Sequence, residues 1–267
     1  MPIHPIASQF FAAPRWKPVR RLIKSVIYSG FKYRCPLCGS MLRTFLPGGL
    51  DFPVLKELEV IGAGRREYAI CPVCGSSDRE RLVHLYATRK LRIGQSPLRL
   101  LHVAPEANLS RKLQQMSRLE YVTADISGQN VMVQMDLTTI QYPEDHFSGI
   151  ICNHVLEHII DDRQAMRELL RVLRPGGWAI LQVPMSKRLP ETREDPAVVT
   201  EADRERVFGQ NDHVRIYASD YTERLQSVGF DVETFRWWTA GEEFASESNR
   251  YGLLRDEDLF VAWKPAQ

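Results

Sequence analysis

The pattern of apolar and polar positions is clearest between residues 145 and 184. Residues 147–152 form a short apolar run rich in Ile, which predicts a buried strand because it is too short for a helix. Apolar residues then recur at helical spacing over 165–173, and residues 178–183 form a second buried run. The Arg-Pro-Gly-Gly segment at 174–177 ends the helix, since Pro cannot continue it and Gly tolerates left-handed dihedrals. This strand, helix and strand form a βαβ unit, which is typical of a parallel sheet covered by helices.

The same alternation of strand and helix extends in both directions from this unit. Short apolar runs predict further strands at 98–103, 119–125, 130–135, 230–237 and 259–263. Helical patterns or caps predict helices at 77–91, 108–116 and 219–228. The chain is therefore expected to have an α/β fold.

Three motifs in this order resemble the middle of a known family. They are F-x-x-I-I at 147–151, N-x-V-L-E-H at 153–158 and L-R-P-G-G-x-x-x-L at 173–181. The combination resembles class I S-adenosylmethionine-dependent methyltransferases. The resemblance implies a Rossmann-like, seven-stranded, mostly parallel sheet whose last strand is antiparallel. The alternative is another doubly wound α/β enzyme that uses the same turn chemistry.

The resemblance also implies where S-adenosylmethionine binds. The family usually has an acidic residue and G-x-G after the first strand, whereas this chain has H-x-A-P-E at 102–106, a variant that resembles a set of bacterial methyltransferases. Asp125 ends the second strand, where a carboxylate can accept both ribose hydroxyls. Asp136 is expected near the adenine, or as a cap of the following turn. The expected cofactor-binding residues are His102, Ala104, Pro105, Glu106, Asp125, Ile126, Asp136, Leu137, Asn153 and His154.

The motif Cys-Pro-x-Cys-Gly-Ser occurs twice, at 35–40 and 71–76. Two such pairs supply the four thiolates of a tetrahedral, structural zinc site, with no open position for catalysis. The expected metal ligands are Cys35, Cys38, Cys71 and Cys74. Redox or unpaired cysteines are the alternative, but two near-identical pairs fit a thioredoxin-like motif poorly. The small zinc-ribbon-like module is expected to have a minor core of its own between the pairs.

Residues 185–219 form a long, charged insert with Pro after the fifth predicted strand. Insertions at the carboxyl edge of such a sheet lie above the ligand crevice, so this segment is interpreted as a substrate lid. Three residues are candidates for the catalytic side: His213 as a general base, His154 beside the cofactor, and Arg215 for an anionic substrate group. The alternative is that His213 and Arg215 fasten the lid to the sheet.

The H-x-x-E-H order of His154, Glu157 and His158 resembles an inverted zinc-protease signature. We interpret it instead as a hydrogen-bonding group, because the family places this motif at the cofactor rim and no third ligand is evident in the sequence.

Charge is distributed unevenly along the chain. Residues 1–50 hold eight Lys and Arg and no acidic residue, which leaves 27 basic and 33 acidic residues in the remainder. A basic N-terminal arm (1–33) is thus expected before the zinc module (34–77), a linking helix (78–96) and the methyltransferase domain (97–267). The arm could contact nucleic acid, an anionic membrane surface or an acidic partner, or simply be solvated.

No apolar run is long enough to span a membrane and no secretory signal is seen, which predicts a cytoplasmic protein.

The resemblance implies methyl transfer from S-adenosylmethionine, and we expect the acceptor to be a hydroxyl or amine of a small molecule, glycan or secondary metabolite. One alternative is an RNA methyltransferase that binds its substrate with the zinc module and the basic arm. Another is a non-catalytic scaffold protein with the same fold, since the first-strand loop lacks the usual glycines. The sequence leaves the acceptor, the pathway and the oligomeric state open.

Overall fold

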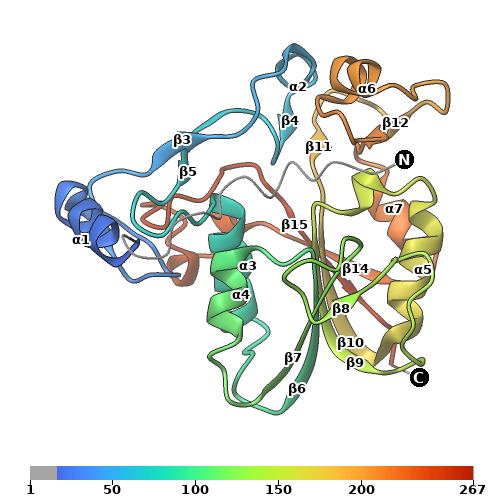
Figure 1. The fold of residues 1–267 in the computed structure, drawn as a ribbon, viewed down its shortest axis with the longest axis horizontal. Coiled ribbons are helices and arrows are strands. Elements are labelled where there is room, and N and C mark those ends of the chain that lie inside the picture. Colours follow the sequence, from blue (N-terminus) through green and yellow to red (C-terminus); the bar gives the residue numbers. More distant parts are fainter. Residues whose placement is uncertain (1–16, 267) are drawn as a thin grey trace.

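The computed structural model describes residues 17–266, and a twisted sheet of seven strands forms its centre (Figure 1). The strand order is β14-β15-β10-β9-β6-β7-β8. The strands are β6 (Leu98–Val103), β7 (Leu119–Asp125), β8 (Val133–Gln134), β9 (Phe147–Asn153), β10 (Leu173–Gln182), β14 (Asp231–Phe235) and β15 (Leu259–Trp263). Strand β15 is antiparallel to both neighbours, whereas the pairs from β10 to β8 are parallel. The predicted Rossmann-like sheet with an antiparallel last strand is confirmed.

Helices cover both faces of the sheet. On one face lie α3 (Asp78–Arg89) and α4 (Ala107–Leu113), and on the other lie α5 (Asp162–Val172) and α7 (Tyr221–Gln226) (Figure 1). All residues of β9 are buried, as expected for a central strand covered on both sides. Its alternate side chains enter two different apolar clusters, with Ile151 in one and Ile150 in the other.

Element ends differ from the predictions where local signals are weak. The Arg-Pro-Gly-Gly segment lies inside β10, which begins at Leu173 and shifts register before Trp178, although the strand was expected to start at 178. Helix α5 ends at Val172 as expected, and Asp161 caps its start by accepting a hydrogen bond from the amide of Gln164. Strand β8 covers only two residues of the predicted 130–135.

The N-terminal part contains a helix and two small two-stranded sheets. Its elements are α1 (Lys17–Ile27), β1 (Ser29–Arg34), β2 (Met41–Leu42), β3 (Leu46–Gly48) and β5 (Arg66–Ile70). Strand β1 pairs with β2 and β3 pairs with β5, both antiparallel. Residues 1–16 of the predicted basic arm lie outside the described residues. Within α1, Leu22 and Val26 are 66% and 70% exposed, so these apolar side chains do not cover the neighbouring domain.

Two distant segments build a single layer above the carboxyl ends of the sheet (Figure 1). The first, between the two Cys motifs, holds α2 (Pro53–Glu57) and β4 (Val60–Ile61). The second, the predicted lid insert, holds β11 (Met185–Ser186), β12 (Arg193–Glu194), α6 (Glu201–Phe208) and β13 (Arg215–Ile216). Strand β4 pairs with β11, and an apolar cluster joins Leu55 of α2 to Phe208 of α6. We call these two segments together the lid layer.

The cysteine module shares its core with the main sheet. One apolar cluster contains Cys35 and Cys71 together with Leu82 and Tyr86 of α3 and Ile180 of β10. A small core does lie between the Cys motifs, but it is shared with the lid: Val54, Leu55, Leu58 and Val60 pack with Phe208 and Ile216. The described residues also include the short 3-10 helices η2 (Leu156–His158), η3 (Trp237–Thr239) and η4 (Glu242–Phe244). Among the described residues, no helix is long and apolar enough to cross a membrane.

Candidate functional site

The two central strands end in strained backbone at the carboxyl edge of the sheet. Ala104, just after β6, has a φ of +45°, and His154, just after β9, has a φ of +54°. Glycine adopts this left-handed region easily, whereas other residues are held there only by their surroundings. The resemblance led us to expect glycine near this position, and the chain instead holds Ala104, which has the smallest side chain after glycine, in the left-handed region.

Glu106 is the centre of a hydrogen-bond network in this loop. Its Oε2 accepts from Nε2 of His102 at 2.9 Å, and its Oε1 accepts from Nδ2 of Asn153 at 3.1 Å. Burial opposes ionisation of this carboxyl, but His102 outweighs it and lowers the pKa of Glu106 to about 2. Tyr121 completes the chain of contacts through its hydroxyl, 2.7 Å from Nδ1 of His102. The predicted residues His102, Glu106 and Asn153 are thus in direct contact.

Helix α3 also reaches this loop, which the sequence reasoning missed. Nε of Arg79 lies 3.6 Å from Oε1 of Glu106 and has no hydrogen-bond partner although it is buried. The neighbouring Glu80 accepts a hydrogen bond from the amide of Leu109 in α4. Both residues belong to the predicted linking helix, whose capping box at Ser77 and Glu80 is formed. A motif search limited to the sheet ends cannot find them.

The next strand ends line the expected adenosine side. Asp125, at the end of β7, is partly exposed, and its Oδ1 accepts from the amide of Ser127 at 2.7 Å. Ile126 is 60% exposed at the rim. Asp136 is exposed and caps the following turn, since its Oδ1 accepts from the amide and hydroxyl of Thr138 at 2.8 Å each. This capping matches the alternative that the sequence left open for Asp136. Leu137 beside it is buried.

Buried polar atoms without partners gather where β9 ends. Among the described residues these include Oδ1 of Asn153, Nε2 of His154 and both carboxylate oxygens of Glu157. Burial first, and the charge of Arg79 next, lower the pKa of His154 to about 4, so its imidazole is neutral. Buried polar groups are normally paired, so such a group of unpaired atoms marks a place where a ligand completes the hydrogen bonds.

The lid layer contacts this group from above. A Cβ placed on Gly62, just after β4, would lie 3.4 Å from Cε1 of His154 and 3.5 Å from Oε1 of Glu257. Glu257 is 2% exposed. Its pKa is raised to about 7, chiefly by burial and then by the charge of Asp78. Gly62 and Glu257 were not among the predicted site residues, because both lie far from the motifs in sequence.

His213 and Arg215 occupy different environments within the lid. His213 is 4% exposed, and its ring meets that of His158 with centroids 4.7 Å apart. Arg215 is 3% exposed and donates to the carbonyls of Leu156 and Ile160 and to Oε2 of Glu194. These contacts match the alternative in which Arg215 fastens the lid to the loop after β9.

The four predicted metal ligands converge just before the start of α3, beside Ser76. The Sγ atoms of Cys35, Cys38, Cys71 and Cys74 all lie within 4.8 Å of one another. Two of these Sγ–Sγ distances, Cys35 to Cys74 and Cys38 to Cys71, are 3.7 and 3.9 Å. Four thiolates about 2.3 Å from a tetrahedral zinc ion need sulfurs about 3.8 Å apart, so the group fits that metal.

The repeated motif explains the symmetry of the cysteine group. The amide of Gly39 donates to the carbonyl of Cys35, and that of Gly75 donates to Cys71, at 2.8 and 2.9 Å. Both glycines have a φ near +80°, at +79° and +81°. Each Cys-Pro-x-Cys-Gly-Ser motif therefore folds into the same turn and presents two thiols to a shared centre.

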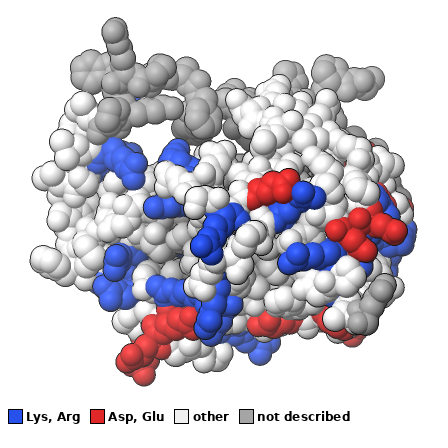
Figure 2. All heavy atoms as spheres, turned by 90° about the horizontal axis from the view of Figure 1, so that it is seen from below, with Lys and Arg blue, Asp and Glu red and all other residues white. Residues whose placement is uncertain are grey.

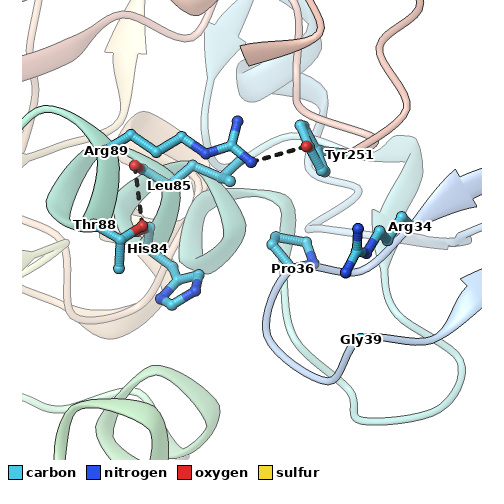
Figure 3. A pocket seen from close by; sticks show the side chains of 8 residues that line it. All are labelled: Arg34, Pro36, Gly39, His84, Leu85, Thr88, Arg89 and Tyr251. Atoms are coloured by element: carbon cyan, nitrogen blue, oxygen red, sulfur yellow. Dashed lines mark hydrogen bonds between the residues drawn. The ribbon is translucent and has the colours of Figure 1, made fainter. Parts of the chain in front are cut away.

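A hollow of about 190 Å³ lies between the first cysteine turn and α3 (Figure 3). Its lining includes His84 and Arg89 of α3 and Tyr251, whose hydroxyl accepts a hydrogen bond from Arg89 at 2.8 Å. None of the residues predicted to bind cofactor or substrate lines it. The hollow is thus separate from the group at the strand ends.

Comparison with known proteins bears on the strand-end site. A family model described as "Methyltransferase domain" matches residues 79–234. Among curated relatives, the ubiquinone/menaquinone biosynthesis C-methyltransferase UbiE of Pseudomonas fluorescens is 28% identical over 71 residues, 27% of this chain and 28% of that protein. The UbiE protein of Pseudomonas savastanoi pv. phaseolicola is 23% identical over 150 residues, 51% of this chain and 58% of the relative. The match therefore spans little more than half of the relative's length at most.

Solved structures give distant likenesses. The carbon methyltransferase of CurJ has a TM-score of 0.45 at 16% identity, covering 70% of this chain and 53% of that one. The 1,6-didemethyltoxoflavin-N1-methyltransferase of Burkholderia thailandensis has a TM-score of 0.43 at 16% identity, covering 68% and 77%. The assignment of a family rests on the matched model, which includes β6 to β10 and the strand-end group.

Proposed function

The chain belongs to the methyltransferase domain family, and we propose that it transfers a methyl group from S-adenosylmethionine to a hydroxyl or amine group of a small molecule, glycan or secondary metabolite. The observation that carries the proposal is the group of buried, unpartnered polar atoms at the end of β9. In open α/β sheets ligands bind at the carboxyl ends of the strands, so this group lies where a cofactor is expected.

The residues present fit that cofactor. Oδ2 of Asp125 can accept from a ribose hydroxyl, because the amide and hydroxyl of Ser127 both donate to Oδ1 instead. The ionised Glu106 supplies negative charge for the ammonium group of the methionine part, and Ala104 lets the backbone approach closely. We place the reacting side beside the unpartnered Oδ1 of Asn153 and Nε2 of His154. His102, Pro105, Ile126, Asp136 and Leu137 complete the proposed pocket by position.

When bound, the cofactor would supply an electrophilic methyl group on a sulfonium sulfur. The protein's part is to hold an acceptor in line with that methyl and to exclude water. The lid layer covers the strand ends and thereby provides the exclusion. We assign the acceptor side to His154 and His213, and we assign Arg215 to positioning the lid, because its guanidinium is occupied by protein acceptors.

The four cysteines are proposed to hold one structural zinc ion, as their spacing supports. Figure 2 shows the face opposite the lid layer, where Lys and Arg side chains lie among acidic and uncharged ones. The proposed site lies on the other side of the molecule, so the small-molecule acceptor stays the proposal and RNA the alternative.

Titration calorimetry with S-adenosylmethionine tests the proposal. Wild-type protein should bind the cofactor, and Asp125→Ala should weaken binding about 10- to 100-fold, because hydrogen bonds to a charged group contribute roughly 1.5–3 kcal/mol. The exposed Asp231→Ala, at the start of β14, serves as the matched control and should bind normally.

Absence of binding by folded wild-type protein rejects the enzyme and favours the scaffold alternative. Unchanged affinity in Asp125→Ala rejects our placement of the ribose. A screen that records S-adenosylhomocysteine release over metabolite hydroxyls, amines and carbon acceptors would then identify the substrate. Carbon acceptors belong in it because the UbiE relatives are named C-methyltransferases.

A further inference from the structure

Three potential metal ligands from separate parts of the chain meet beside the cofactor region. Glu157 and His158 belong to η2, just after β9, and His213 lies in the lid before β13. One ligand atom from each lies within 4.8 Å of the other two. The sequence pattern of His154, Glu157 and His158 showed no third ligand, and the fold supplies it from the lid.

Glu157 is the strongest indication that this group binds a cation. Glu157 is 1% exposed, and neither of its carboxylate oxygens accepts a hydrogen bond. Nδ1 of His154 lies 3.3 Å from Oε1 without forming a hydrogen bond. A buried carboxylate that lacks donors is unfavourable by several kcal/mol unless a cation compensates it.

The rings of His158 and His213 meet edge to face, at 85°. One nitrogen of each ring lies within 4.8 Å of the other and of a carboxylate oxygen of Glu157, so all three atoms are close enough to share one ion. Nδ1 of His158 lies 3.2 Å from Oδ2 of Asp212. A carboxylate behind a histidine in this way fixes the ring and its tautomer in many metal sites.

We propose that Glu157, His158 and His213 bind a divalent transition-metal ion, with Asp212 orienting His158. Two imidazoles and one carboxylate suit Mn²⁺, Fe²⁺, Co²⁺, Ni²⁺ or Zn²⁺ better than Mg²⁺ or Ca²⁺, which prefer oxygen ligands. Three protein ligands leave coordination positions open. The site is distinct from the four-cysteine group, whose ligands are all thiols.

The position of this ion suggests that it activates the methyl acceptor. This inference rests on the proposed methyl transfer. Asn153 contacts Glu106 of the cofactor loop, and Glu157 follows it by one short turn. An acceptor hydroxyl in an open position would lose its proton to solvent water more easily, because the cation lowers its pKa. The oxygen then bonds to the methyl carbon as the carbon–sulfur bond breaks, and the electron pair stays on the sulfur. The acceptor class is therefore a hydroxyl compound.

The test uses Mn²⁺ binding by the full chain, followed by electron paramagnetic resonance of the free ion. Mn²⁺ prefers nitrogen and oxygen ligands, so zinc held by the cysteines does not interfere. Wild-type protein should bind one Mn²⁺ per chain in a saturable manner. Glu157→Gln and His213→Asn should each lower that affinity at least tenfold, and Asp212→Asn should lower it less. His146→Asn, which changes a histidine outside the site, should bind as wild type does.

Circular dichroism and cofactor calorimetry on the same samples show whether each variant is folded. Absence of saturable Mn²⁺ binding by the wild type, or equal affinity in folded Glu157→Gln and His213→Asn, overturns the metal site. Failure of the two proposals is distinguishable: Mn²⁺ binding without cofactor binding rejects only the methyl transfer, whereas cofactor binding without Mn²⁺ binding rejects only the metal.

Discussion

At the scale of single residues, Glu257 has the clearest energetic consequence. It is buried, and burial followed by the charge of Asp78 raises its pKa to about 7. The unfolded chain loses this proton near the ordinary value of 4.5, whereas the folded chain keeps it until about pH 7. Stability from this group is therefore fully present at low pH and is lost as the pH rises through that window.

Replacement of this carboxyl by an amide should remove the loss. We expect Glu257→Gln to match the wild type near pH 4.5 and to exceed it at pH 8 by about 1–3 kcal/mol in the free energy of unfolding. Urea unfolding at several pH values measures the difference. Glu247→Gln, on an exposed neighbour in sequence, should show no such trend, and a constant difference for Glu257→Gln would contradict the assignment.

The site could be predicted from sequence only where its residues belong to local motifs. His102, Glu106 and Asn153 could be proposed because each lies at or just after the carboxyl end of a strand whose apolar run is plain in the sequence. Arg79 and Glu257 were missed, since they reach the site through the packing of α3 and of the segment before β15. The meeting of His213 with Glu157 likewise depends on how the lid folds back, which no spacing in the chain encodes.

At the scale of elements, the sheet was predictable and the lid layer was not. Strands such as β9 are wholly buried and contain a clear apolar run, so their pattern can be recognised in the sequence. Strands β4 and β11 hold two residues each and pair across a long stretch of sequence. Pairs of this kind exist because tertiary packing brings them together, so they have no local signal. The helices α2 and α6 similarly gain their stability from each other.

The coupling of α2 to α6 gives an element-scale prediction. Leu55 is 3% exposed, and a Cβ on Gly209 at the end of α6 would lie 2.5 Å from its Cδ2. We expect Leu55→Ala to leave a cavity and to weaken the lid layer by about 2–4 kcal/mol. Hydrogen exchange should then quicken both in residues 53–61 and in residues 201–217.

The control for this experiment is Val199→Ala, which shortens a lid residue that is 66% exposed. It should leave exchange in both segments unchanged. Faster exchange confined to residues 53–61 after Leu55→Ala would show that the two segments move independently, contrary to a single lid layer.

At the scale of the whole molecule, the cysteine module and the sheet are joined by buried charge as well as by apolar packing. Arg81 of α3 is fully buried and donates to the carbonyls of Ala69 and Ser76 in the module and of Tyr251 and Gly252 near the C-terminal strand. Its guanidinium also lies 3.9 Å from the ring centre of Phe45. A buried cation with this many acceptors makes separate unfolding of either side costly.

Because the module and the sheet are joined in this way, loss of the proposed zinc ion should destabilise both of them together. An independent module would unfold alone when Cys71 is replaced, leaving the sheet intact. Because Cys71 shares one apolar cluster with Trp178 and Trp237, we expect Cys71→Ser to lower the midpoint of a single cooperative transition instead. Near-ultraviolet circular dichroism, which reports on the tryptophans, and far-ultraviolet circular dichroism should then give coincident unfolding curves.

A chelator should lower the same midpoint in the wild type. Added zinc should restore the midpoint of the wild type but not that of Cys71→Ser. A tryptophan signal that survives an earlier loss of secondary structure would instead show that the module is a separate folding unit.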